Sequence, residues 1–239
     1  MILVYQQPPT TETGEGQVPD DAAKQQAKPG QTTDRAGFFT DAVFAIASTL
    51  LVIEIPRPQG AEFEVKDGVS AERAAHNLWH FLVAQDAAFY AYVLAFFVLW
   101  IVWRQHHALL DQVGHLSPAM IGWHFPLLLL AAFLPYAATV FGHYSGNPLA
   151  ALLFGVVVLV LLTCRTAIQS GARSDGALLP TADRHALDAN ITASWAVVAY
   201  WAVITALVWW VSWAPLLWIA TTVVGSASVW LAMRRAPAS

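Results

Sequence analysis

Two long segments of this 239-residue chain contain no Asp, Glu, Lys or Arg. The first covers residues 112–164 and the second covers residues 189–233. A helix needs about 20 apolar residues to cross a bilayer, so each segment is long enough for two crossings and a turn. The whole chain is 57% apolar and only 12% charged, which is too little charge to cover a soluble domain. We therefore predict an all-α, multi-pass integral membrane protein.

Helix-breaking residues divide the apolar sequence into six predicted spans. Pro56 ends the first span, because proline cannot continue a helical hydrogen-bond pattern. Turn-forming residues at 145–148 and 212–215 divide the two uncharged segments. The predicted spans are residues 36–56, 80–103, 119–144, 149–168, 191–211 and 216–233. Residues 34–235 are thus predicted to form a single six-helix domain.

Residues 1–33 are rich in Gln, Thr, Pro, Gly and acidic side chains. A segment of this composition cannot bury enough apolar surface to offset its ordering entropy, so we expect a disordered tail. Basic residues indicate on which side of the membrane the tail lies, because short cytoplasmic loops carry an excess of Lys and Arg. With the N-terminus inside, nine basic residues fall inside and three outside, the latter being Arg57, Lys66 and Arg73. We therefore expect both termini in the cytoplasm and the protein in the cell (inner) membrane.

Several classes of function lack support in the sequence. The net charge is −4 and the basic residues form no patch, so we expect no nucleic-acid partner. Cys164 is the only cysteine, which excludes a disulfide framework. His76 and His80 have the i, i+4 spacing of a metal-binding pair, but no acidic or cysteine companion stands in the right register. We expect no metal, no cofactor and no catalytic residue.

The first span differs from the others because it carries a carboxylate, Asp41, about six residues inside its apolar boundary. Such a group costs roughly 2.5–3.5 kcal/mol at the centre of a membrane helix and indicates a functional site. At 100° per residue, one side of this helix forms an apolar stripe with a single hydroxyl. The stripe consists of Ile46, Thr49, Leu50 and Ile53. Asp41 and Ser48 lie on the opposite side.

Asp41 needs a polar partner within the protein. Candidates are Arg35, on the same helix, and His106 or His107, at the end of the second span. An antiparallel neighbour would bring either histidine to the same depth as Asp41. A purely structural interpretation remains open, in which the stripe packs on a neighbouring helix and the Asp41 pair fixes the fold.

Three motifs resemble those of the transmembrane protein 175 family of potassium channels. The first is Arg35-x-x-x-Phe39-Thr40-Asp41, where threonine replaces the usual serine. The second is Trp103-x-x-His106-His107. The third is Phe133-Leu-Pro-Tyr-x-x-Thr139, which has tyrosine in place of phenylalanine.

The resemblance implies a homotetramer in which the first helix of each subunit lines a central pore for potassium. It implies that Ile46 forms the narrowest hydrophobic ring, that Leu50 and Ile53 form further rings, and that Thr49 contributes to potassium preference. It also implies that a buried polar network holds this helix. The network residues are Arg35, Phe39, Thr40, Asp41, Trp103, His106 and His107.

The chain contains no Thr-Val-Gly-Tyr-Gly sequence, so it lacks the carbonyl filter of other potassium channels. Selectivity would have to come from pore width, dewetting and nearby hydroxyls, and we expect a weak preference for potassium over sodium. An alternative is a proton- or ion-coupled transporter that uses Asp41, Asp86, Glu54 and the histidines as a relay. A membrane enzyme or haem protein that uses the histidines is a third hypothesis, for which His124 alone gives weak support.

Overall fold

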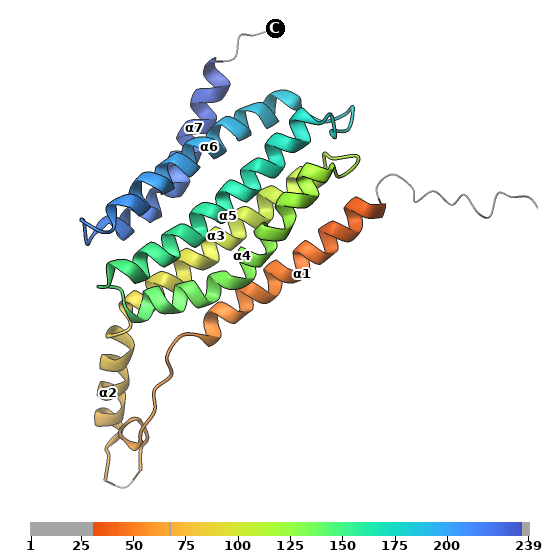
Figure 1. Ribbon diagram of the computed structural model, residues 1–239. Helices are drawn as coiled ribbons and strands as arrows, with labels where there is room; N and C mark the ends of the chain where they lie inside the picture. Colours follow the sequence, from red (N-terminus) through yellow and green to blue (C-terminus); the bar gives the residue numbers. More distant parts are fainter. Residues whose placement is uncertain (1–30, 67, 236–239) are drawn as a thin grey trace, which may run out of the picture.

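The computed structural model describes residues 31–66 and 68–235, and within them it is a helical bundle with a small extension (Figure 1). The helices are α1 (Gln31–Ile53), the 3-10 helix η2 (Ala61–Phe63), α2 (Ala71–Val83), α3 (Asp86–Leu110), α4 (Pro118–His143), α5 (Pro148–Ser174), α6 (Arg184–Leu207), the 3-10 helix η3 (Ala214–Ala220) and α7 (Thr221–Arg235).

Six segments of the described chain are long and apolar enough to cross a membrane. They are Thr33–Ile53, Asp86–Leu110, Pro118–His143, Pro148–Ser174, Arg184–Leu207 and Ala214–Met233. The predicted fold class, an all-α membrane protein with six spans, is therefore confirmed. The last span combines η3 with α7, because Pro215 and the turn before it delay the start of the α-helix.

The first span begins earlier than predicted. Helix α1 starts at Gln31 and ends at Ile53, whereas the sequence predicted residues 36–56. Residues 31–33, which the prediction assigned to the disordered tail, are therefore helical. The rest of the predicted tail, residues 1–30, lies outside the described residues.

The predicted second span, residues 80–103, was wrong at both ends. The chain turns at residues 84–85, and the spanning helix α3 runs from Asp86 to Leu110. Asp86 accepts a hydrogen bond from the Ala87 N–H (2.7 Å), at a helix start where a negative charge is favoured. The apolar residues before this turn belong to α2, a separate amphipathic helix that hydropathy alone had merged with the span.

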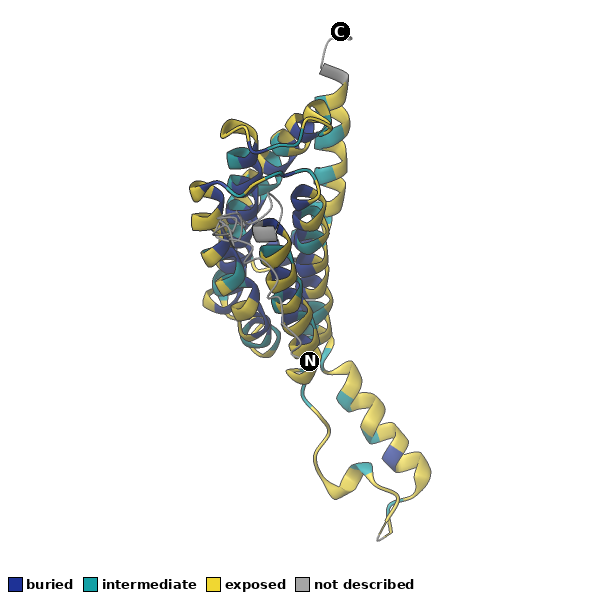
Figure 2. Ribbon diagram, turned by 90° about the vertical axis from the view of Figure 1, so that its right-hand side faces the viewer, coloured by how far each residue is buried: buried dark blue, intermediate teal, exposed yellow. Residues whose placement is uncertain are grey.

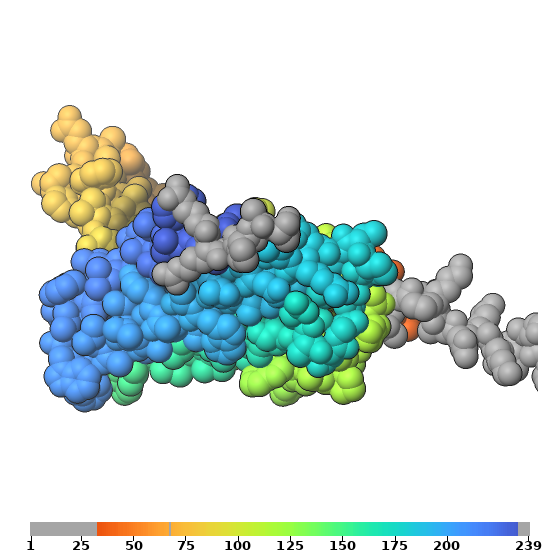
Figure 3. All heavy atoms as spheres, turned by 90° about the horizontal axis from the view of Figure 1, so that it is seen from above, coloured from red at the N-terminus to blue at the C-terminus, as the bar shows by residue number. Residues whose placement is uncertain are grey.

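Helix α2 and the loop before it project from the bundle as a separate lobe (Figures 2 and 3). This lobe is held by its own contacts. Phe63 and Phe81 pack edge to face with ring centroids 5.4 Å apart, and Asn77 Nδ2 donates to the carbonyl oxygen of Glu62 (3.0 Å). The membrane-spanning bundle therefore consists of the other helices.

The core of the bundle is formed by helices that pack at close range. Gly155 of α5 lies so close to α6 that a Cβ there would come within 2.7 Å of Thr205 Oγ1. Near this point the buried rings of Trp201 and Trp218 stack with centroids 5.1 Å apart. Helix α1 lies at one edge of the bundle, against α3 and α4, while α6 and α7 lie at the opposite edge (Figure 1). One side of α1 is therefore free within a single chain.

Candidate functional site

Helix α1 has a buried face and an exposed face. The buried face contains Thr40, Phe44, Ala47 and Leu51, each at most 2% exposed. Their spacing of three or four residues places them on one side of the helix, which packs against α3 and α4. This face fixes the position and rotation of α1 in the bundle.

The predicted pore stripe lies on the exposed face. Ile46 is 60% exposed, Leu50 40% and Ile53 55%, and Thr49 is also exposed. Thr49 Oγ1 donates a hydrogen bond to the carbonyl oxygen of Ile46 (2.8 Å), which directs the hydroxyl back along the helix. The four side chains of the stripe are therefore uncovered and free to face a pore or other subunits.

Asp41, near the middle of α1, contacts two residues of α3. Its Oδ1 accepts a hydrogen bond from Trp103 Nε1 (2.7 Å) and lies 3.6 Å from His107 Nδ1. Of the partners considered from the sequence, the structure brings His107 to Asp41, and it adds Trp103. Arg35 is exposed and makes no hydrogen bond or ion pair with the described residues, and Phe39 is 63% exposed.

His106 and Thr40 are buried away from this pair. The His106 side chain is 1% exposed, and its ring packs edge to face on that of His124 in α4, with centroids 4.9 Å apart. Within the described part of the chain, neither ring nitrogen of His106 nor the Thr40 hydroxyl has a hydrogen-bond partner. The predicted polar network thus divides into the Asp41 contacts and a buried histidine pair, and the sequence analysis had not paired His124 with His106.

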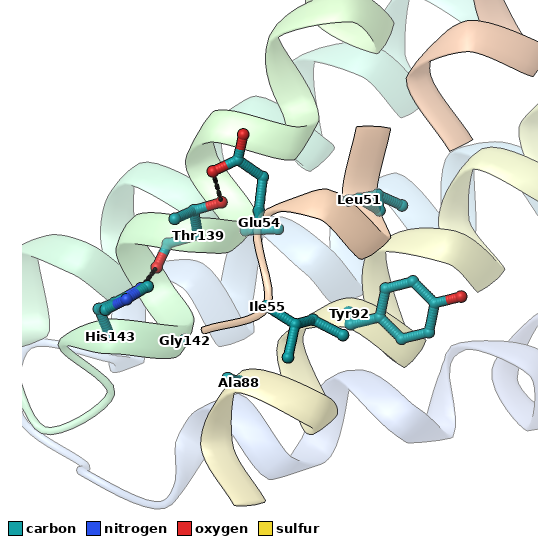
Figure 4. Close-up of a pocket in the computed structure, with 9 residues that line it drawn as sticks. Leu51, Glu54, Ile55, Ala88, Tyr92, Thr139, Gly142 and His143 are labelled. Atoms are coloured by element: carbon teal, nitrogen blue, oxygen red, sulfur yellow. Dashed lines mark hydrogen bonds between the residues drawn. The ribbon is translucent and has the colours of Figure 1, made fainter. Parts of the chain in front are cut away.

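A second contact holds the C-terminal end of α1, and the sequence analysis had not included it in the site. Thr139 Oγ1 of α4 lies 3.2 Å from Glu54 Oε2, directly after α1, and 2.9 Å from the carbonyl oxygen of Pro135. His143 Nδ1 lies 3.0 Å from the carbonyl oxygen of Thr139 (Figure 4). Thr139 belongs to the third motif, so this motif places a hydroxyl against the end of α1.

The described residues contain no group of three His, Cys, Asp or Glu side chains that could hold a metal ion. His76 Nε2 and His80 Nε2 lie 3.1 Å apart on α2, at hydrogen-bond distance from each other. Cys164 is buried and unbonded. The arrangement of α1, with one face anchored and the other uncovered, is the strongest candidate for a functional site.

Comparisons with known proteins relate this chain to potassium channels. Residues 35–135 match the family model of the endosomal/lysosomal potassium channel TMEM175. A potassium channel of Chamaesiphon minutus is 29% identical over 161 residues, which are 66% of this chain and 74% of the relative. A potassium channel of Streptomyces collinus is 30% identical over 131 residues, which are 53% of this chain and 58% of the relative.

A solved structure has the same fold. The crystal structure of a lysosomal potassium-selective channel TMEM175 homolog from Chamaesiphon minutus superimposes with a TM-score of 0.65 and 24% identity. The match covers 85% of this chain and 97% of that one. Nearly all of the homolog's helical architecture is therefore present here.

Proposed function

We propose that this chain is a member of the TMEM175 potassium channel family and forms a potassium-preferring cation channel around four copies of α1. The observation that carries this proposal is the exposed stripe on a helix that is otherwise firmly anchored. Ile46, Leu50 and Ile53 are large apolar side chains left uncovered at the edge of the bundle. A helix with one fixed face and one free face suits the wall of a pore shared between subunits.

The pore lies between chains and not within one. The interior of a single chain is filled by large side chains such as Phe154, Trp201 and Trp218, each fully buried. If each subunit contributes only its α1 helix to the wall of an ion pore, several subunits must form a ring with closed rotational symmetry. A homotetramer in lipid satisfies this requirement.

The side chains of the stripe supply a barrier and a weak preference. A ring of Ile46 side chains disfavours water and hydrated ions, so it limits conduction by dewetting. Thr49 donates its proton to the Ile46 carbonyl (2.8 Å), which leaves the lone pairs of its oxygen free for a passing cation. We assign the ring to the gate and Thr49 to potassium preference.

The relay hypothesis for a coupled transporter finds no support in the geometry. Asp41 lies near the middle of α1 and Glu54 directly after its end, 13 residues and thus about 20 Å apart. Asp41 is held by Trp103, and Asp86 accepts a hydrogen bond from the Ala87 N–H in the first turn of α3. We propose no catalytic role and no cofactor, with potassium as the permeant ion. We place both termini in the cytoplasm and the protein in the inner membrane.

Reconstitution of the purified protein tests the proposal. We expect discrete unitary currents in a planar bilayer, larger for potassium than for sodium, and a mass in mild detergent corresponding to four chains. Smooth flux without unitary steps would favour a carrier. A monomer in detergent, with full activity at single-copy incorporation, would contradict a pore built from several α1 helices.

A further inference from the structure

A buried arginine lies in the middle of the bundle without a carboxylate beside it. Arg165 of α5 is 3% exposed, and its Nη2 donates to Ser194 Oγ of α6 (2.5 Å). Within the described residues, its Nε and Nη1 have no hydrogen-bond partner, and it forms no ion pair with an acidic side chain. A guanidinium always carries its charge, and an uncompensated buried charge is strongly unfavourable. A bound anion would therefore stabilise the charge of Arg165.

A second arginine faces the same place from the surface. Arg104 of α3 is exposed and has no hydrogen bond or ion pair within the described residues. Arg104 and Arg165 border a groove of about 440 Å³ between α3, α5, α6 and α7, together with the polar side chains of Gln105 and Asn190. No carboxylate lines this groove. The groove is therefore positively charged and offers amide donors beside its two arginines.

The nearest acidic groups lie beyond the groove. A cavity of about 550 Å³ shares both arginines and adds Asp111 and Asp183. Both acids are exposed, and Asp183 Oδ1 accepts a hydrogen bond from the Ala186 N–H (2.9 Å) at the start of α6. Solvation and helix capping therefore satisfy these carboxylates, and neither forms an ion pair with Arg165.

The rest of the groove is apolar and continues along α3. Phe97, Trp100 and Ile101 line it opposite Val197 and Val229. Through Phe97 and Ile101 it joins a second groove of about 250 Å³, which extends to Tyr90 and Trp218. Tyr90 and Arg104 are 14 residues apart on one helix, about 21 Å, which is comparable with the ~15 Å half-thickness of a bilayer core. An acyl chain fits this length.

We propose that this groove binds an anionic glycerophospholipid, with its phosphodiester on Arg104 beside the buried charge of Arg165 and one acyl chain along α3. Two arginines without a carboxylate partner stand next to an apolar groove, and this combination favours a lipid over a free anion. A zwitterionic lipid brings its own positive charge into the arginine site and is a poorer match. The inference concerns lipid binding and does not depend on ion conduction.

Thermal unfolding of the full chain in mixed micelles tests the proposal. We expect phosphatidylglycerol to raise the unfolding midpoint progressively with its mole fraction, and phosphatidylcholine with the same chains to raise it much less. Inorganic phosphate at equal concentration should leave the midpoint unchanged. Equal stabilisation by both lipids, or equal stabilisation by inorganic phosphate, would overturn the proposal.

Three variants locate the effect. Arg104→Gln should weaken the apparent affinity for phosphatidylglycerol about tenfold, because it removes a charge-assisted hydrogen bond. Arg184→Gln removes an exposed arginine at the same end of the bundle and serves as the matched control, with little change expected. Val229→Trp fills the apolar groove without altering charge and should likewise weaken the response to phosphatidylglycerol. The proposal fails if Arg104→Gln and Val229→Trp both respond as the parent does.

Discussion

The two faces of α1 make opposite use of similar side chains. Leu51 and Leu50 are neighbours of identical chemistry, yet Leu51 is 2% exposed and Leu50 is 40% exposed. Leu51 packs against the helices of its own chain, whereas Leu50 has no such cover. One face therefore contributes to the stability of the subunit, and the other is available for function. Substitutions on the two faces should separate these roles.

The largest effect on stability should come from the buried face. Leu51→Ala leaves a cavity against neighbouring helices and should lower the free energy of unfolding by about 2–3 kcal/mol, near the low end for Leu→Ala because lipid offers the unfolded helix an apolar environment. The thermal unfolding midpoint in detergent measures this loss. The potassium-to-sodium flux ratio should not change, and a changed ratio with unchanged stability would contradict the division between faces.

The next largest effect on stability should come from the contacts of Asp41 with α3. Asp41→Ala leaves Trp103 Nε1 without its acceptor and removes the carboxylate that lies 3.6 Å from His107 Nδ1. It should cost about 1–2 kcal/mol, because both partners are only partly buried. We expect less tetramer in mild detergent and little change in ion preference. Asp41→Asn keeps an acceptor oxygen for Trp103 and should be milder. A fully assembled Asp41→Ala protein with altered selectivity would refute this role.

The exposed face should affect conduction more than stability. Ile46→Asn wets the proposed ring and should raise cation flux while reducing potassium preference, with a change in unfolding free energy of less than about 0.5 kcal/mol. Liposome flux with each cation measures both quantities.

Val52 provides the matched control for this substitution. It is 54% exposed on the same helix but lies 120° from Ile46, so Val52→Asn should leave selectivity unchanged. Phe44 is unsuitable as a control because it is buried, at 2% exposure. If the Val52 variant alters selectivity and the Ile46 variant does not, the pore lies on another face.

The smallest change should come from Thr49→Ala. This substitution removes one exposed hydroxyl, so flux and stability should remain close to those of the parent. Only the preference for potassium should weaken, as reversal potentials under mixed potassium and sodium gradients would show. Thr49→Ser restores the hydroxyl and should recover the preference.

The sequence by itself determined the features that depend on local composition and helical periodicity. Two long uncharged segments predicted four of the six spans, and the apolar stretches before them predicted the other two, since a helix satisfies its own backbone hydrogen bonds in lipid. The period of 3.6 residues placed Ile46, Leu50 and Ile53 on one side of α1, and the structure leaves that side exposed. Their role as a pore lining remains a prediction.

Only the tertiary structure decided which distant residues meet. Asp41 could have paired with Arg35 or either histidine, and the packing of α1 on α3 selected Trp103 and His107, more than 60 residues away. The packing of α1 on α4 brought Glu54 to Thr139, 85 residues along the chain. The packing of α5 on α6 enclosed Arg165 without a counter-charge from the described residues. Hydropathy also could not separate α2 from α3, because apolar residues stand on both sides of the turn between the two helices. These outcomes depend on which helix faces come into contact, and no local pattern encodes that choice.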